Sequence, residues 1–272
     1  MTTRTLARQA EAQTNSPWFR AVARTGMAAR GVIFLIIGLL AIQVATGNGG
    51  DTTDQKGALA NVAARPYGEG LLIALAAGLA AYAVWRLAQG FLDTDDKGDD
   101  GKGWVVRASK VGSGVAYGVL FFSALAILMG SRGGGSGTGS EKQTTAGVLG
   151  WPGGQAWVLL AAAAIAGVAV WNLYRGLGRK FMKRLHPSRR MRGTVTAVGV
   201  VGMTARAVVF GLIAAFLAKA AIEYDPAEAV GLDGALARLA GQAYGLALLF
   251  LVAAGLVAFA LYCFAEARYR EV

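Results

Sequence analysis

The chain has 272 residues, of which 55% are apolar and 16% are charged, and its mean hydropathy is +0.46. A soluble domain carries about 25% charged residues, so this composition excludes an ordinary soluble protein and indicates a membrane protein. The single cysteine, Cys263, excludes an intramolecular disulfide and a cysteine-rich metal site.

Six apolar stretches are long enough to cross a hydrocarbon core of about 30 Å at about 1.5 Å per residue. They cover residues 27–45, 69–89, 111–129, 156–174, 196–221 and 243–264. Each is expected to be helical, because a segment in lipid must satisfy its backbone hydrogen bonds internally. The sequence therefore predicts an all-α integral membrane protein with six transmembrane helices.

The basic residues predict the orientation of these helices. If both termini are cytoplasmic, all but six of the 27 Lys and Arg residues lie on the cytoplasmic side. The exceptions are Lys56, Arg65, Arg132, Lys142, Lys219 and Arg238. This bias is the positive-inside pattern. It explains the net charge of +11 without a nucleic-acid partner.

The spans form three tandem repeats. Gly26-Met27-Ala28-Ala29-Arg30 opens the first span and returns as Gly202-Met203-Thr204-Ala205-Arg206, and a weaker middle copy places Tyr117 at the position of Arg30. The even spans match at offsets of 86 and 177 residues, and the glycines that open them are Gly68, Gly154 and Gly245. Each repeat thus contains two helices, and all three repeats share one orientation in the membrane.

These landmarks divide the chain into six segments. They are a disordered cytoplasmic tail (1–16), repeat 1 (17–92), an acidic cytoplasmic linker (93–103), repeat 2 (104–180), a basic cytoplasmic linker (181–193) and repeat 3 (194–272). Short surface helices are expected at 57–63 and 234–240, and a flexible Gly/Ser stretch from Gly133 to Ser140. Repeats of equal orientation can form a pseudo-threefold ring around the membrane normal or a side-by-side array.

Polar and aromatic residues recur at the cytoplasmic ends of the spans. The odd spans begin with Arg30, Tyr117 and Arg206, and the even spans end with Trp85 and Gln89, Trp171 and Arg175, or Tyr262 and Glu266. One interpretation is an interfacial belt in which the aromatics anchor the helices and pack against them, while the arginines extend to lipid phosphates. The presence of Tyr117 at an arginine position favours this belt. The alternative is a cytoplasmic-side polar ring, in which Arg30 and Arg206 pair with Glu266 or Gln89.

Catalytic motifs are missing from the sequence. The one histidine, His186, cannot form a histidine-pair metal motif, and there is no complete G-x-G-x-x-G, phosphate loop or G-x-S-x-G elbow. We therefore expect no enzymatic activity, catalytic residue, cofactor or metal. Glu69, Glu223 and Glu266 lie near the ends of spans, which argues against ion coupling through the middle of the membrane.

The loop from Arg179 to Arg192 is the most basic segment of the chain. Each basic residue near an anionic leaflet contributes about 1 kcal/mol of attraction, so we expect anionic lipids to bind here. Phe181, Met182 and Leu185 are interleaved with the basic residues and are expected to dip into the interface.

With the repeats aligned, the chain resembles the bacterial membrane-protein family known as domain of unknown function 1206. The residues that carry the resemblance are Gly26, Arg30, Gly31, Phe34, Tyr82, Trp85, Arg86, Gln89, Gly90, Gly202, Arg206 and Phe210. The middle repeat departs from the pattern, with Tyr117 and with Asn172 at the position of Arg86. The resemblance implies three two-helix repeats in the bacterial inner (plasma) membrane, and it implies no activity.

Two functions are compatible with these features. The first is a non-enzymatic structural or interaction component of the membrane, with the lipid bilayer as its surroundings. The alternative is a small-molecule or ion transporter or channel with its path between the three repeats. Protein partners, the oligomeric state and any substrate stay open.

Overall fold

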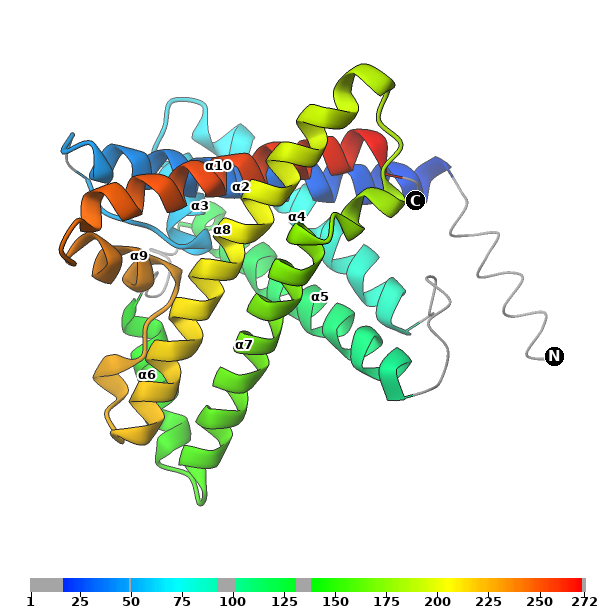
Figure 1. Cartoon of the computed structure of the whole chain (residues 1–272). Helices are drawn as coiled ribbons and strands as arrows, with labels where there is room; N and C mark the ends of the chain where they lie inside the picture. Colours follow the sequence, from blue (N-terminus) through cyan, green and yellow to red (C-terminus); the bar gives the residue numbers. More distant parts are fainter. Residues whose placement is uncertain (1–16, 49, 92–100, 131–137, 271–272) are drawn as a thin grey trace. The chain divides into compact units, whose positions relative to one another are not determined.

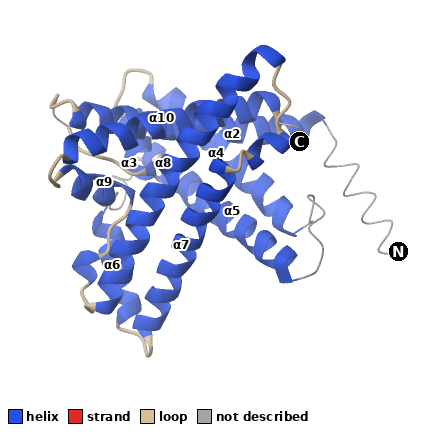
Figure 2. Cartoon of the chain, in the orientation of Figure 1, coloured by secondary structure: helices blue, strands red, loops and turns tan. Residues whose placement is uncertain are grey.

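The computed structural model describes residues 17–48, 50–91, 101–130 and 138–270, and within them every regular element is helical (Figures 1 and 2). The elements are α2 (Pro17–Ala45), α3 (Gln55–Ala63), α4 (Gly68–Phe91), α5 (Gly101–Leu128), α6 (Thr138–Leu149), α7 (Gly154–Leu177), η1 (Lys180–Arg184), α8 (Arg189–Ile222), η2 (Pro226–Glu228), α9 (Leu232–Ala240) and α10 (Gly245–Tyr269). The 3₁₀ turns are η1 and η2.

Six of these helices are long and apolar enough to cross a membrane, as the sequence predicted. The spans are Arg20–Ala45, Gly68–Phe91, Gly103–Leu128, Gly154–Leu177, Arg189–Ile222 and Gly245–Tyr269, with mean hydropathies from 1.8 to 2.6. The odd spans begin earlier than predicted. Their helices continue through polar and basic residues that precede the apolar run, and an apolar window cannot detect those residues.

The short helices α3 and α9 confirm two predictions, and α6 corrects a third. The Gly/Ser stretch was expected to be flexible as far as Ser140, but α6 begins at Thr138; residues 131–137 lie outside the described part of the chain, as does the predicted disordered tail 1–16. The predicted linkers are also too long. Helix α5 includes residues 101–103 of the predicted acidic linker, whose residues 93–100 lie outside the described part of the chain, while η1 and the start of α8 occupy much of 181–193.

The same tight turn precedes each even helix. The residue before the helix has a left-handed backbone in all three cases, with φ of 62° at Tyr67, 69° at Gly153 and 59° at Tyr244. The next residue is the glycine that opens the helix: Gly68, Gly154 and Gly245. A Cβ on any of these glycines would collide with carbonyl oxygens at the end of the preceding short helix. The turn therefore explains why glycine recurs at offsets of 86 and 177.

The described residues fold into two compact units. Unit 1 comprises those within Met1–Arg30, Val62–Arg132 and Cys263–Val272; unit 2 comprises those within Gly31–Asn61 and Gly133–Tyr262. Unit 1 contains α4 and α5 together with the first turns of α2 and the last turns of α10. Its core is formed by Ala23, Met27, Tyr82 and Trp85, none more than 1% exposed.

Unit 2 is built on the packing of α7 against α8, which lie side by side in Figure 1. The turn η1 folds back on this unit, and Phe181 and Leu185 are only 2% and 4% exposed. The Phe181 ring meets Tyr262 edge to face at 5.2 Å, in space that Gly199 leaves open because a Cβ there would strike the ring. The expectation that Phe181 and Leu185 dip into the lipid interface is therefore wrong.

Candidate functional site

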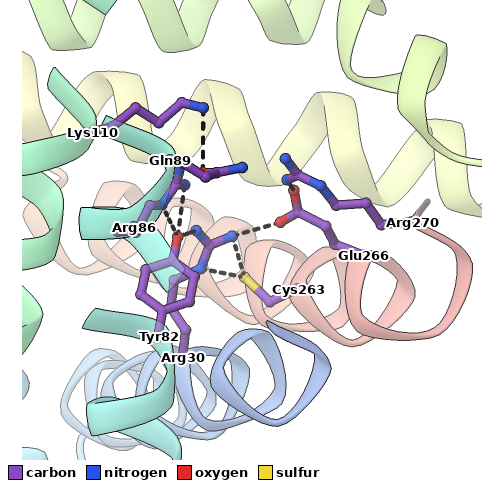
Figure 3. A network of polar contacts seen from close by, with 8 residues as sticks. All are labelled: Arg30, Tyr82, Arg86, Gln89, Lys110, Cys263, Glu266 and Arg270. Atoms are coloured by element: carbon purple, nitrogen blue, oxygen red, sulfur yellow. Dashed lines mark hydrogen bonds and ion pairs between the residues drawn. The ribbon is translucent and has the colours of Figure 1, made fainter. Parts of the chain in front are cut away.

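Arg30 is the centre of a polar network within unit 1 (Figure 3). It lies on α2 and is only 5% exposed. Its Nη1 donates to Tyr82 Oη at 2.6 Å and its Nη2 to Glu266 Oε2 at 2.9 Å. Its Nε and Nη2 also donate to Cys263 Sγ at 3.3 and 3.2 Å. Arg30 is thus not a lipid anchor, and the alternative pairing with Glu266 is the one present.

Close packing of α2 on α4 brings Arg30 to Tyr82. A Cβ added at Gly26 would lie 2.6 Å from Cβ of Tyr82 and 2.7 Å from its backbone N and Cα. One turn away on α4, Gly78 likewise leaves room for Ala29 of α2, whose Cβ would lie 2.5 Å from a Cβ added at Gly78. The two helices therefore touch at their backbones, one helical turn before Arg30. The glycine of the opening pentapeptide is needed for this contact.

Glu266 uses both carboxylate oxygens within the network. Its Oε2 accepts from Arg30, and its Oε1 accepts from Arg270 Nη1. The side chains of Glu266, Arg30 and Arg270 are between 6% and 9% exposed. Arg270 also lies over the Trp85 ring, 4.8 Å from its centroid. A buried carboxylate is tolerated when it is paired and hydrogen-bonded, and Glu266 meets both conditions.

A second branch of the network runs along α4. Arg86 donates to Tyr82 Oη from Nε at 2.9 Å and from Nη2 at 2.7 Å, and its Nη1 donates to Gln89 Oε1 at 3.3 Å. Lys110, on α5, donates to the same amide oxygen at 3.2 Å. We call Arg30, Tyr82, Arg86, Gln89, Lys110, Cys263, Glu266 and Arg270 the unit 1 network.

Aromatic rings enclose this network on its apolar side. The Tyr117 ring meets Tyr82 at 4.4 Å, and the Tyr82 ring lies 5.5 Å from Trp85. Trp85 is 1% exposed and Tyr262, in unit 2, is 2% exposed. Both residues pack inside the protein, as the packing part of the expectation has it, and neither is exposed as an anchor at the lipid interface would be.

Unit 2 contains the other predicted site residues. Arg206 lies over three phenylalanine rings, those of Phe34, Phe210 and Phe259, at 5.7, 5.0 and 4.9 Å. Tyr262 packs against Phe259 at 6.0 Å. Trp171 and Arg175 lie on α7, where Trp171 is 55% exposed and stacks at 5.8 Å on Tyr174. Unit 1 thus brings together Arg30, Tyr117, Trp85, Gln89 and Glu266, whereas Trp171 remains at a surface.

Sequence reasoning missed several members of the network as site residues. Tyr82 and Arg86 are among the residues that carry the family resemblance, and their spacing of four residues places them on one helical face. Arg270 follows Glu266 by four residues, which is the spacing of a helical ion pair, so this partner could have been found. No sequence signal singled out Cys263 or Lys110.

The network can hold helices together through charge. It joins α2, α4, α5 and α10 within unit 1, where Arg30 donates to Tyr82, Cys263 and Glu266. Across the described residues, no three His, Cys, Asp or Glu side chains gather as they would around a metal ion. The chemistry of the site is therefore ion pairing and hydrogen bonding between helices.

A separate, half-buried carboxyl group lies in unit 2. Glu141, on α6, packs on Gly231, where an added Cβ would lie 2.6 Å from Glu141 Oε1. Burial raises the pKa of Glu141, and the nearby carboxylates Asp233 and Asp54 raise it further, against the opposing effects of a backbone hydrogen bond to its carboxylate and of Lys56. Folding therefore favours the protonated, uncharged form of Glu141.

Replacing Glu141 with glutamine is expected to stabilise the protein at pH 7 by up to about 1 kcal/mol, because it removes a charge that folding disfavours. The gain should shrink as the pH falls through the raised folded-state pKa toward the ordinary glutamate value of about 4.3, since Glu141 is then protonated already. Thermal unfolding in detergent at several pH values measures this. Glu223→Gln, at a half-exposed pair with Lys219, is the control; a loss of stability in Glu141→Gln would contradict the account.

Six membrane-competent helices define this chain as a multi-pass α-helical membrane protein. The family model described as "Domain of Unknown Function (DUF1206)" matches it three times, over residues 25–93, 108–179 and 201–270. The chain therefore belongs to this family. Each matched segment covers one whole even span and the larger part of the odd span before it.

One relative extends the match over nearly the whole chain. A protein of Bacillus subtilis (strain 168) described as "Uncharacterized protein YxxB" is 32% identical over 263 residues, which cover 96% of this chain and 94% of the relative. No solved structure matches the chain.

Proposed function

We propose that the protein is a non-enzymatic, multi-pass component of the plasma membrane with a structural or interaction role. The observation that carries the proposal is the Arg30–Glu266 ion pair, which is buried and directed at protein atoms. Buried charges that serve substrates face a cavity or water path, whereas these bind one helix to another. The lack of catalytic motifs in the sequence agrees with this role.

We also propose that the chain is organised as three two-helix repeats with both termini in the cytoplasm. The distribution of basic residues supports this orientation. Equivalent contacts support the repeats: Gly26 makes room for Tyr82 in unit 1, and Gly202 makes room in the same way for Phe259 in unit 2. Arg30 lies 5.3 Å from the Tyr82 ring and Arg206 lies 4.9 Å from the Phe259 ring.

Anionic lipids are the proposed partners of the loop from Arg179 to Arg192. Phe181 and Leu185 fix this loop to unit 2, while its basic residues Lys183, Arg189, Arg190 and Arg192 are exposed. The loop thus holds several positive charges in place at a surface. Attraction of about 1 kcal/mol for each basic residue supports binding to an anionic leaflet.

A transporter or channel is the second candidate, because ionisable residues within spans often mark ion or substrate pathways. Arg30 and Glu266 both lie within spans. The two candidate functions differ in whether a small solute should bind at the unit 1 network. A structural protein needs no small solute there, whereas a transporter must admit one.

Extraction of the full chain in native lipid, followed by mass spectrometry of what remains bound, tests these proposals. The structural role predicts anionic lipid but no small solute. The lipid should decrease when Arg189, Arg190 and Arg192 are all changed to glutamine. The matched control changes Lys56, Arg65 and Lys142 to glutamine, because the proposed orientation places these residues on the opposite side of the membrane. A bound solute that is lost in Glu266→Gln would contradict the structural role and support transport.

A further inference from the structure

Two tyrosines adopt a backbone conformation that suits glycine better. Tyr67 and Tyr244 have φ of 62° and 59°, and Gly153 has φ of 69° at the same place in the middle repeat. A bulky side chain is strained in this left-handed region, whereas glycine is not. The local backbone therefore does not explain why two of the three turns carry tyrosine.

Helix capping does not explain the tyrosines either. The carbonyl of Tyr67 accepts from Leu71 N at 3.3 Å and that of Tyr244 from Leu248 N at 3.1 Å, which begins the hydrogen bonds of α4 and α10. This contact uses the backbone, which any residue supplies, whereas side-chain caps are formed by Ser, Thr, Asp and Asn. The tyrosine side chains are 91% and 89% exposed, so each ring extends away from the protein.

Each tyrosine lies where an exposed apolar surface begins. Four residues after Tyr67, Leu71 of α4 is 56% exposed in unit 1; four residues after Tyr244, Leu248 of α10 is 43% exposed in unit 2. Both helices are long and apolar enough to cross a membrane, and lipid tails are as apolar as leucine. The leucines therefore face lipid, and the tyrosines lie at the end of the hydrocarbon layer.

The middle repeat has an aromatic ring close to the same place. Gly153 replaces the tyrosine there, but Trp157 aligns with Leu71 and Leu248 at the repeat offsets and is 57% exposed. Every even span thus carries an exposed aromatic ring in its first turn or just before it. Tyrosine and tryptophan concentrate at membrane–water interfaces because each ring has an apolar body and a polar tip.

We propose that Tyr67 and Tyr244 anchor α4 and α10 in the lipid headgroup layer, on the side of the membrane where the even spans begin. Each ring lies against the ends of the acyl chains, and its hydroxyl donates to headgroup and glycerol-ester oxygens. The anchors fix the depth of the tight turns in the bilayer, whether the protein is structural or a transporter. The aromatic anchoring expected at Trp85 and Tyr262 thus belongs to the opposite ends of the same two helices.

Nuclear Overhauser contacts between tyrosine rings and lipid test the proposal. The full chain is deuterated except at its eight tyrosine rings and is held in a bilayer of protonated lipid. Tyr67 and Tyr244 should show cross-peaks to headgroup and glycerol protons, whereas Tyr262, which is 2% exposed, should show none. Tyr67→Gly and Tyr244→Gly should each remove one set of cross-peaks. Both variants should fold, because glycine adopts the left-handed backbone without strain.

Three results would overturn the proposal. The first is a wild-type spectrum in which no tyrosine ring contacts headgroup or glycerol protons, and this result requires no variant to fold. The second is a set of headgroup cross-peaks that persists unchanged in both glycine variants, because these peaks then come from other exposed tyrosines, such as Tyr174 or Tyr224. The third is contact of Tyr67 and Tyr244 with water alone or with acyl chains alone, which places their rings outside the headgroup layer.

Discussion

Replacing Glu266 with glutamine is expected to reduce the free energy of unfolding by about 3–5 kcal/mol. The substitution keeps the shape of the side chain but leaves Arg30 and Arg270 buried without their shared carboxylate. Removing one partner of a buried ion pair leaves an uncompensated charge, and this makes the loss large. Denaturant unfolding of the purified protein in detergent micelles measures it.

Glu223→Gln is the matched control. Glu223 pairs with Lys219 at 3.7 Å, but both side chains are about half exposed, and exposed pairs contribute only about 0–1 kcal/mol. If both substitutions cost the same, the Arg30–Glu266 pair does not hold unit 1 together.

Gly26→Ala is expected to cost about 1–3 kcal/mol, as overpacking does in a well-packed core. The added Cβ would lie 2.6 Å from Tyr82 Cβ and 2.7 Å from its backbone atoms. Backbone cannot move aside as a flexible side chain can, so α2 and α4 must separate. The separation would also lengthen the hydrogen bond from Arg30 to Tyr82. Thermal unfolding in detergent measures the loss.

Gly118→Ala provides the comparison, because a Cβ at Gly118 meets nothing within 4 Å. Alanine favours a helix over glycine by about 0.5–1 kcal/mol, so this variant should be unchanged or more stable. Equal losses in the two variants would mean that the close approach at Gly26 is unimportant.

Much of the fold could be predicted from sequence because membrane crossing is a strong constraint. Length and hydropathy are sufficient to locate six spans, and the offsets of 86 and 177 correctly identify the glycines of the repeated turn. The start of α6 could not be located from composition, since Thr138 to Ser140 look like a continuation of the glycine-rich stretch although they begin a helix.

Only part of the site could be predicted from the sequence. Helical spacing places Tyr82, Trp85 and Gln89 on one face, but periodicity does not tell whether that face meets lipid or another helix. Burial of Trp85 depends on the approach of α2 at Gly26. Phe181 shows the same limit, because its packing beside Gly199 is a tertiary contact between residues that no local pattern relates.

The central claim is that the unit 1 network is closed within the protein, and the single cysteine tests it directly. Cys263 is fully buried and accepts from Arg30. In membranes containing the wild-type protein, a charged, water-soluble thiol reagent should leave Cys263 unlabelled, and labelling should follow only after unfolding in dodecyl sulfate. Labelling of Cys263 in the folded protein at a rate near that of a free thiol would show that water reaches the network, and would contradict the structural account.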